Sequence, residues 1–413
     1  MTKRRDWRVR FFTIWGGQAF SLVGSSLVRF ALIWWLTEET GSATVLTSAT
    51  LISSLPMIGL APFTGALVDR WNRRRVMIIS DAMIAFFSGV LAYLFWLGSV
   101  RVWHVYVVLF LRAIGDVFQT PAMRASTSLL VPKDQLARVA GLNDTVHGIV
   151  NIVAPPLGAL LVAILNMQGV LAIDLITALM AIVPLFFLRI PQPPTSYDHQ
   201  EDSTLWQEML TGFRFVWHWQ GLTFMFMVLG GLWFFVAPAV SLLPLMVTEH
   251  FGGDVVELGW MNSAYGFGFV AGGFLLGVWG GFKRRTATAV LGLIGLGLGS
   301  LTFGLVSADA FWLAIIAVFL SAMMLPLVRG SVMAIFQIHV PPDLQGRVFN
   351  LLLSSLSLMA PVGLALGGPL ADAYGVPVIF IISGVGCIGL AMTWLLSQSI
   401  MQLEAEGHPR LQT

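Results

Sequence analysis

Charged and polar side chains recur at helical spacing inside runs that are otherwise apolar. Arg112, Asp116 and Gln119 stand at i, i+4 and i+7, so on a helix they form one stripe whose two charges are close enough to pair. If the run crosses a bilayer, a charge there costs about 2.5–3.5 kcal/mol and must face a cavity or a partner. The stripe therefore indicates a carboxylate that binds a proton or cation beside an arginine.

Two further runs carry matching polar stripes, which contain Gln18, Ser21, Ser25 and Arg29 in one case and Asp144, His147 and Asn151 in the other. We expect Asp116 to lie between Arg112 and Arg29 and to titrate as that pairing changes. The alternative is a permanent ion pair that joins two helices. For Asp144 and His147 we favour gating or structural pairing over protonation.

The remaining charges inside apolar runs have simpler explanations. Asp81 is expected to partner the basic loops, Asp174 to lie at the membrane interface, and Arg124 to contact Asp69 or Asp81 from another helix. The second half of the chain offers fewer anchors for a substrate, namely Asn262, Tyr265 and Arg329. Trp233, with Phe234 and Phe235, could line an apolar substrate wall, and packing against lipid explains these aromatic residues equally well.

The sequence gives little support to an enzyme. It contains no G-x-x-x-x-G-K-[ST] loop for nucleotide phosphates and no metal-ligand spacing among its seven His residues. The single Cys387 allows no internal disulfide and is expected to pack or face lipid. We therefore predict no cofactor and no metal, and no nucleic-acid partner is needed to explain a net charge of +2.

Composition shows which elements must position these residues. The chain is 57% hydrophobic and only 11% charged, where soluble domains carry about 25% charged residues. A spanning helix takes about 20 apolar residues, so 413 residues allow roughly twelve spans. We predict an all-α membrane protein with helices near residues 11–36, 45–68, 76–98, 104–131, 139–165, 170–188, 221–247, 257–281, 287–306, 310–338, 348–371 and 376–399.

The distribution of Lys and Arg predicts the orientation. These residues cluster in alternate loops, at 70–75, 133–138 and 283–285, whereas Arg101 stands alone on the opposite side. Because short cytoplasmic loops carry the excess of positive charge, both termini are expected to be cytoplasmic.

The chain also contains a repeat. Residues 131–139 and 340–348 share the pattern V-P-x-D-x-x-x-R-V at an offset of about half the chain, as a duplicated six-helix unit predicts. In each copy, Pro is expected to end one helix and Asp to cap the next. We predict six-helix bundles at 1–188 and 221–413, joined by a cytoplasmic linker at 189–220 that contains an amphipathic helix.

A loop motif follows the second run. Gly65 is expected to let helices approach closely, Asp69 to accept hydrogen bonds at the helix end, and Arg70 and Arg73 to form a cytoplasmic latch. A topogenic role explains the arginines equally well. Three pairs of glycines in the second half are expected to pack the two halves together: Gly268 with Gly272, Gly273 with Gly277, and Gly363 with Gly367.

These motifs resemble those of the major facilitator superfamily. The G-x-L-x-D-R-x-x-R-R-R loop is similar to its best-known signature, and Arg112 with Gly115 resembles its R-x-x-x-G element with the glycine one residue early. The segment from Gly148 to Gly158, which includes Pro155, resembles the antiporter motif of drug/proton exporters, with Ala154 in place of a glycine. Asp6-Trp7-Arg8, Leu36-Thr37-Glu38 and Gly346-Arg347-Val348-Phe349 resemble segments of the macrolide-efflux subfamily.

The resemblance implies a monomeric proton antiporter that exports amphiphilic, macrolide-like drugs across a bacterial plasma membrane by alternating access. Its expected partners are the substrate, protons and the lipid bilayer. Three alternatives stay open: an uptake symporter of the same fold, an exporter or flippase of siderophores or lysolipids, and a membrane sensor that transports nothing.

Overall fold

The computed structural model describes residues 2–188, 190, 220–340 and 342–397. Within these, only the backbone is described at 2–6, 61, 62, 66, 69, 220 and 342–357. The predicted linker at 189–220, apart from Ile190 and the backbone of residue 220, lies outside the described residues, as does its expected amphipathic helix.

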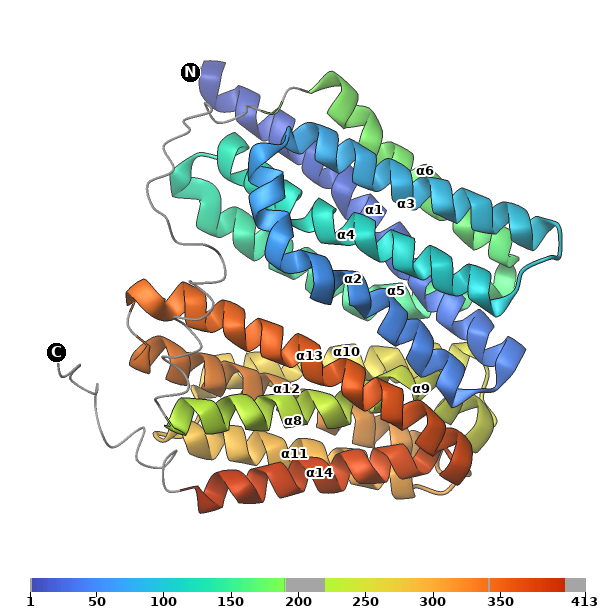
Figure 1. Cartoon of the computed structure of the whole chain (residues 1–413), viewed down its shortest axis with the longest axis vertical. Coiled ribbons are helices and arrows are strands. Elements are labelled where there is room, and N and C mark those ends of the chain that lie inside the picture. The colour runs from blue at the N-terminus through green and yellow to red at the C-terminus, as the bar shows by residue number, and fades with distance from the viewer. Residues whose placement is uncertain (1, 189, 191–219, 341, 398–413) are drawn as a thin grey trace. The chain divides into compact units, whose positions relative to one another are not determined.

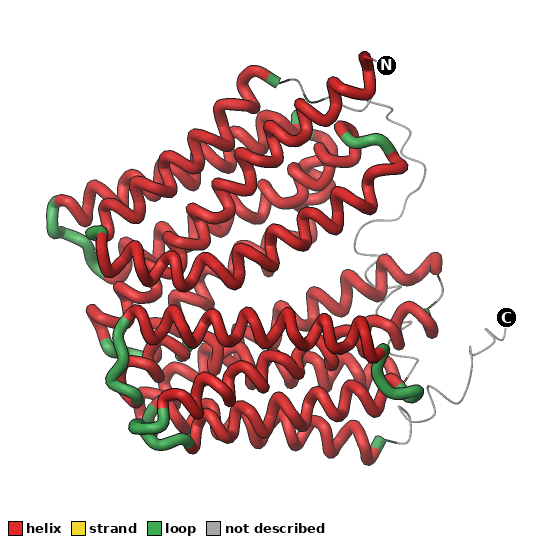
Figure 2. Tube along the Cα trace, turned by 180° about the vertical axis from the view of Figure 1, so that it is seen from behind, coloured by secondary structure: helices red, strands yellow, loops and turns green. Residues whose placement is uncertain are grey.

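The described residues form helices and loops, with no strand among them (Figure 1, Figure 2). Twelve helices have 21 residues or more: α1 (Thr2–Thr40), α2 (Ala43–Arg70), α3 (Arg73–Trp96), α4 (Val102–Leu130), α5 (Leu136–Ile164), α6 (Met167–Phe187), α8 (Gln220–Ser241), α10 (Val255–Trp279), α11 (Arg285–Leu305), α12 (Phe311–His339), α13 (Pro342–Tyr374) and α14 (Val376–Leu396). Each matches one predicted span, which confirms the predicted fold class. Eleven of them are long and apolar enough to cross a membrane within the part of the chain searched.

Short signals separate the helices. Gly41 adopts a φ of 54° between α1 and α2, and Gly375 a φ of 91° between α13 and α14, a left-handed region that glycine enters without steric cost. Asn72 caps α3, because its side chain accepts a hydrogen bond from the Arg75 N–H at 3.2 Å. After α8, a short helix α9 (Leu243–Leu245) and a π-helical turn (Met246–His250) lead toward α10.

Asp134 does not cap α5 as predicted. It lies in a 3₁₀ turn, Lys133–Gln135, and α5 begins at Leu136 without a side-chain cap on its first N–H groups. Its carboxylate instead accepts a hydrogen bond from Gln135 Nε2 at 3.0 Å. The extra turn after Pro132 uses the residues that would otherwise have formed the cap.

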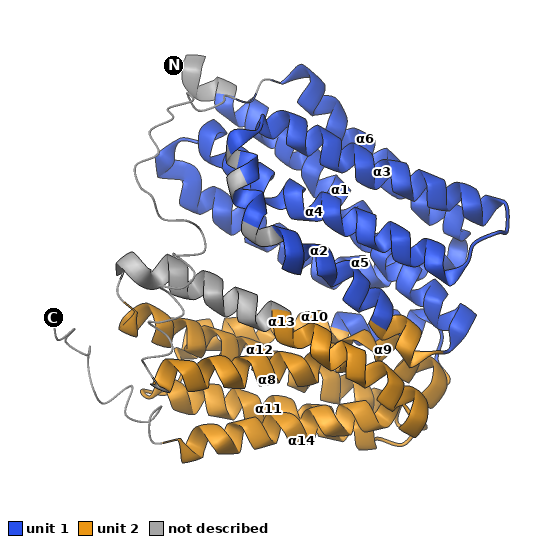
Figure 3. Ribbon diagram, in the orientation of Figure 1, with its two compact units in different colours: residues 1–41, 48–197, 253–263 blue, residues 42–47, 198–252, 264–413 orange. Residues whose placement is uncertain are grey.

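The chain divides into two compact units (Figure 3). Unit 1 comprises residues 1–41, 48–197 and 253–263, and unit 2 comprises residues 42–47, 198–252 and 264–413. In unit 1, α1 packs against α5 and α6, and α3 packs against α4 and α6. In unit 2, α8 packs against α13 and α14, and α11 packs against α12 and α14. Each pairing recurs six spans later, as expected for a duplicated unit.

Two of the three glycine pairs, Gly268 with Gly272 and Gly363 with Gly367, pack helices within unit 2, so the expectation that they join the two halves is wrong. A Cβ on Gly273 or Gly277 would meet no described atom within 4 Å. A Cβ on Gly268 or Gly272 of α10 would collide with the carbonyl oxygens of Phe319 and Met323 on α12. A Cβ on Gly363 of α13 would collide with the Phe234 carbonyl oxygen on α8. These contacts explain the small residues by the close approach of neighbouring helices.

Gly272→Ala is expected to destabilise the protein by about 1–3 kcal/mol, because the added methyl group overlaps backbone atoms that cannot rotate away. The neighbouring Gly273 is exposed and a Cβ there meets no atom within 4 Å. Gly273→Ala is therefore the matched control and is expected to be neutral or stabilising by up to about 1 kcal/mol. Thermal unfolding in detergent checks the pair, and equal unfolding temperatures would contradict the close contact.

Asp372, at the end of α13, holds the first turn of α2 within unit 2. Its carboxylate accepts hydrogen bonds from the backbone N–H groups of Ala43 at 2.7 Å and Thr44 at 3.0 Å, and from Ser42 Oγ at 3.2 Å. Partial burial acts to raise the pKa of Asp372, and the hydrogen bonds from Thr44, Ala43 and Ser42 outweigh it, so the pKa lies below its usual value of 3.8. Asp372 thus caps a helix that begins 329 residues earlier.

Asp372→Ala is expected to cost about 1 kcal/mol of stability at neutral pH, the usual effect of losing a helix cap. Because the pKa of Asp372 is lowered in the folded state, this contribution is complete above pH 3.8 and disappears as pH falls through the folded-state value. Thermal unfolding of both proteins at neutral pH and at a pH well below 3.8 measures the difference. A difference that persists unchanged in acid would show that the carboxylate charge is not the cause.

Candidate functional site

A buried ion pair joins four helices of unit 1. The Arg112 guanidinium on α4 donates from Nη1 to Asp174 Oδ2 on α6 at 2.5 Å, and the two residues are 7% and 0% exposed. Ser88 on α3 donates to the same carboxylate at 2.7 Å and also contacts Arg112, and Ser25 on α1 donates to Asp174 Oδ1 at 3.3 Å. The pair is therefore satisfied by hydrogen bonds as well as by charge.

This arrangement corrects two predictions. Arg112 pairs with Asp174 and not with Asp116 on its own helix, and Asp174 is fully buried and not interfacial. α3 and α4 lie close together at Gly115, one turn from Arg112, where a Cβ would come within 2.7 Å of Ile84 Cγ1 and 3.3 Å of the Ser80 carbonyl oxygen. The glycine of the R-x-x-G element therefore allows two helices to approach closely.

Asp116 pairs instead with Arg29 of α1. Asp116 Oδ2 and Arg29 Nη2 are 3.6 Å apart, and the side chains are 47% and 68% exposed. The pair thus lies on a face that the helices of unit 1 leave uncovered, where each partner can meet water or a solute. A pair this exposed stabilises a fold by only about 0–1 kcal/mol.

A third polar cluster links α1, α3 and α4. Gln18 Nε2 donates to Asp81 Oδ2 at 2.8 Å, Gln119 Nε2 donates to the same oxygen at 3.3 Å, and Gln119 Nε2 also donates to Gln18 Oε1 at 2.6 Å. Asp81 is 3% exposed. The expectation that Asp81 partners the basic loops is therefore wrong, because two neutral amides on neighbouring helices hold it.

The stripe on α5 is open. Asp144, His147 and Asn151 are exposed, and no ion pair between Asp144 and His147 occurs in the described structure. The neighbouring Asn143 accepts a hydrogen bond from Trp15 Nε1 of α1 at 2.6 Å, a contact that sequence spacing did not reveal.

The antiporter-like segment of α5 packs against α1. Pro155 lies within α5, and the helix continues through it. A Cβ at Gly158 would come within 2.8 Å of Phe30 Cδ1, so this glycine sets the distance between α5 and α1.

The loop motif after α2 is only partly as predicted. A Cβ at Gly65 would meet no atom within 4 Å among the described residues. The Asp69 side chain lies outside the described ones, and Arg70 is exposed. Arg73 is buried and donates to the Ala125 carbonyl oxygen of α4 at 3.4 Å, so it ties two helices inside unit 1.

Two further arginines, Arg74 and Arg124, lie at this end of unit 1. Arg74 donates hydrogen bonds to the carbonyl oxygens of Leu185 and Phe186 at the end of α6, the second at 2.7 Å. A basic residue that binds the last carbonyl groups of a helix also complements its dipole. Arg124 is exposed, and its suggested contact with Asp81 is wrong because Asp81 is held by the two glutamines.

Among the polar anchors of the second half, Asn262 donates within α10 to the Leu258 carbonyl oxygen at 3.0 Å. In unit 2, Tyr265 is half-buried, within electrostatic reach of the exposed Arg329. Trp233 is half-buried on α8.

The aromatic residues next to Trp233 differ in their surroundings. Phe235 packs into the core of unit 2, and a Cβ on Gly386 of α14 would lie 2.7 Å from its ring. Phe235 is thus a half-buried residue that contacts this core from α8. Cys387 packs in the same core and is fully buried.

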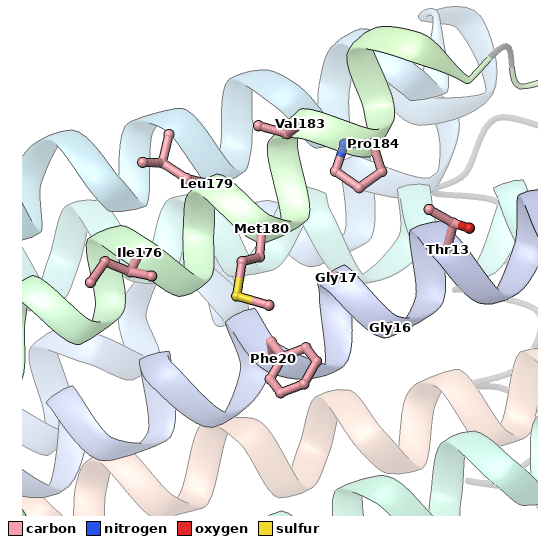
Figure 4. Close-up of a pocket in the computed structure, with 9 residues that line it drawn as sticks. All are labelled: Thr13, Gly16, Gly17, Phe20, Ile176, Leu179, Met180, Val183 and Pro184. Atoms are coloured by element: carbon pink, nitrogen blue, oxygen red, sulfur yellow. The ribbon is translucent and has the colours of Figure 1, made fainter.

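An apolar groove of about 560 Å³ runs between α1 and α6 on the outside of unit 1 (Figure 4). It is lined by Thr13, Gly16, Gly17, Phe20, Ile176, Leu179, Met180, Val183 and Pro184. The groove exists because Gly17 lets α1 approach the backbone of Met180. Its lining has no charged side chain, and the polar residues described above are not part of it, so it is separate from the candidate site.

The fold and the charged residues inside it define a class of protein. The model of the Major Facilitator Superfamily matches residues 14–247 and 234–403, and the chain belongs to this superfamily of membrane transporters. It is therefore a multi-pass membrane protein that moves a small molecule.

Similarity to individual proteins extends over nearly the whole chain. It is 34% identical to macrolide efflux protein A of Streptococcus pyogenes over 405 residues, which cover 98% of this chain and all of that protein. It is 24% identical to the multidrug efflux pump Tap of Mycolicibacterium fortuitum over 399 residues, 94% of this chain and 95% of that one. A bacterial homologue of the lysosomal transporter Spinster shares the fold, with a TM-score of 0.71 and 13% identity over 96% of this chain and 98% of that one.

Proposed function

We propose that this protein exports amphiphilic small molecules, including macrolide-like drugs, by proton antiport. The observation that carries the proposal is the full-length similarity to a macrolide efflux protein at 34% identity. The similarity to a multidrug efflux pump supports a broad range of amphiphilic substrates.

The Asp116–Arg29 pair supports the coupling step. Both side chains are exposed on unit 1, so a proton or a cationic solute can compete for Asp116. When Arg29 leaves, Asp116 becomes an unpaired carboxylate inside the membrane, which strongly favours the uptake of a positive charge. In alternating access, Asp116 would exchange Arg29 for a proton or a cationic solute when the conformation changes. This exchange couples proton entry to substrate exit.

The other predicted residues are assigned supporting roles in this proposal. Gln18, Ser25 and Gln119 extend the polar surface around the coupling residues, and Asp144, His147 and Asn151 line an exposed face of α5. The substrate would be bound by apolar contact area and by a few polar groups, contributed by Trp233, Asn262, Tyr265 and Arg329. The motif residues would act in the conformational change, namely Gly65, Asp69, Arg70, Arg73, Pro155 and Gly158.

The proposed setting is the plasma membrane of a bacterium, with both termini in the cytoplasm. The distribution of Lys and Arg between alternate loops supports this orientation. The protein is proposed to work as a monomer in the bilayer, with six-helix bundles at 1–188 and 221–413 joined by a cytoplasmic linker at 189–220.

Accumulation of a 14-membered macrolide and of a cationic dye in bacteria that express the chain tests the substrate class. Expressing cells are expected to accumulate less of both compounds than cells with an empty vector, and a protonophore is expected to remove the difference. If neither compound is exported and a lysolipid or siderophore is, the drug assignment is wrong. If no compound of any of these classes moves, the protein is better explained as a sensor.

A further inference from the structure

We propose that Asp81, held by Gln18 and Gln119, is the site that binds the transported proton. The inference deepens the proposed proton antiport and rests on it, since it names a second carboxylate besides Asp116. Unit 1 contains three aspartates on α3, α4 and α6, and each of them has a different environment.

The charges around Asp81 distinguish it from the other two aspartates. Asp174 contacts the Arg112 guanidinium and Asp116 contacts that of Arg29, whereas the hydrogen bonds to Asp81 come from neutral amides. The charged groups that act most strongly on Asp81 from the neighbouring helices are Asp116 of α4 and Asp174 of α6, both of which are acidic. Arg112 and Arg29 are each engaged by one of those two acids.

Burial without a cation has a clear consequence for a carboxyl group. Asp81 is 3% exposed, and an ionised carboxylate without a compensating charge is costly to bury. Such a group becomes neutral by taking up a proton, whereas Asp174, with an arginine in contact, can keep its charge. Asp81 is therefore the carboxyl group of this cluster that a proton occupies.

The hydrogen bonds of the cluster also lack one donor. Gln119 Oε1 is buried and has no hydrogen-bond partner in the described structure, while Gln119 Nε2 already contacts Asp81 Oδ2 and Gln18 Oε1. Within the described part of the chain, the hydrogen bonds to the Asp81 carboxylate both end on Oδ2, which leaves Oδ1 for a proton. A proton on Asp81 supplies a further donor to a cluster that otherwise has an excess of acceptors.

The position of Asp81 links proton binding to substrate binding. If the proton leaves to water, Asp81 becomes an anion within electrostatic reach of Asp116. The two like charges then favour the binding of a cationic amphiphile near Asp116, and a bound proton disfavours it. Proton and substrate therefore exclude one another, which is the requirement for antiport.

Infrared difference spectroscopy of the purified full-length protein tests the site without any transport measurement. At about pH 7, where exposed carboxyl groups are ionised, the wild type is expected to show the carbonyl stretch of a protonated carboxyl group. Asp81→Asn is expected to lose this band, and Asp81→Glu to move its frequency. The control Asp309→Asn, which removes an exposed loop carboxylate, is expected to keep it.

Two spectroscopic results would overturn the assignment: a band that persists unchanged in both Asp81 variants, or a band lost in Asp116→Asn and kept in Asp81→Asn. Asp81→Glu keeps the test decisive if the asparagine variant does not fold, because a shifted band still assigns the carboxyl group.

A transport measurement then separates this inference from the proposed function. In proteoliposomes, Asp81→Asn is expected to exchange labelled macrolide for unlabelled macrolide but to lose accumulation driven by a pH gradient. Wild-type protein that moves no macrolide contradicts the proposed function. If the wild-type and Asp81→Asn proteins both accumulate macrolide with the pH gradient, only the role of Asp81 is contradicted. Accumulation that follows a sodium gradient instead of the pH gradient also excludes Asp81 as the proton site.

Discussion

Asp174→Asn is expected to destabilise the protein by about 3–5 kcal/mol, because it leaves the Arg112 guanidinium buried without a counter-charge. Asp174 is the fully buried acceptor of hydrogen bonds from Arg112, Ser88 and Ser25, so one substitution weakens contacts among four helices. The unfolding temperature in detergent and the yield of monodisperse protein measure the effect.

A double variant provides the control for this prediction. Replacing both partners, in Arg112→Met with Asp174→Leu, removes both buried charges and is expected to recover most of the lost stability. The double variant also shows whether Arg112 takes part in coupling, since a folded protein that still exports drug with a proton gradient would assign the pair to structure alone. Wild-type stability in Asp174→Asn would mean that the two side chains are not paired in the membrane.

Asp116→Asn is expected to have the opposite profile. The Asp116–Arg29 pair is exposed and stabilises the fold by only about 0–1 kcal/mol, so the unfolding temperature should stay near that of the wild type. Coupling free energies of about 1–3 kcal/mol correspond to roughly 5- to 150-fold, and we expect proton-driven export to fall by a factor in that range. Export rates in inverted vesicles, with the pH gradient imposed, measure this loss.

Arg29→Gln is the partner variant and Asp309→Asn the control. If the pair acts as a unit, Arg29→Gln and Asp116→Asn should each reduce coupling, and the double variant should be no worse than either alone. Asp309→Asn should leave export unchanged. Full proton-driven export by Asp116→Asn would leave the pair as a structural contact, the alternative already considered from the sequence.

The fold could be predicted from the sequence because its signals are long and redundant. Each apolar run is about as long as a bilayer-spanning helix, and Gly41, Gly98 and Gly375 mark turns between spans. The repeated V-P-x-D-x-x-x-R-V segment indicated a duplication, and the helix pairings recur with the corresponding offset. Hydropathy and motif spacing can be read from the chain alone. A prediction based on them still holds when a helix end is misplaced by a few residues.

The contacts of the candidate site were harder to predict from the sequence, because they join different helices. Spacing on α4 put Arg112 and Asp116 on one stripe, yet each pairs with a residue on another helix, Asp174 and Arg29. A sequence shows which residues share a face and does not show which helices approach within reach of a long side chain. Gly115 was the available signal, since a glycine beside an arginine in a span indicates a close helix contact.

Glycine and arginine patterns were also ambiguous for a physical reason. A small residue in a span is compatible with close packing and with open surface, and Gly272 and Gly273 are neighbours with opposite environments. Basic residues at helix ends satisfy the orientation rule whether or not they bind anything. Arg74 binds two carbonyl groups of α6 while Arg70 is exposed, and this difference depends on the helix rotation that the structure supplies.

Transport by the purified protein in proteoliposomes, with an acidic lumen and no other energy source, tests the central claim most directly. We predict that a macrolide accumulates in the lumen against its gradient, that the lumen becomes more alkaline at the same time, and that a protonophore stops both changes. Accumulation without any change in luminal pH, or accumulation that persists with the protonophore, would contradict proton antiport.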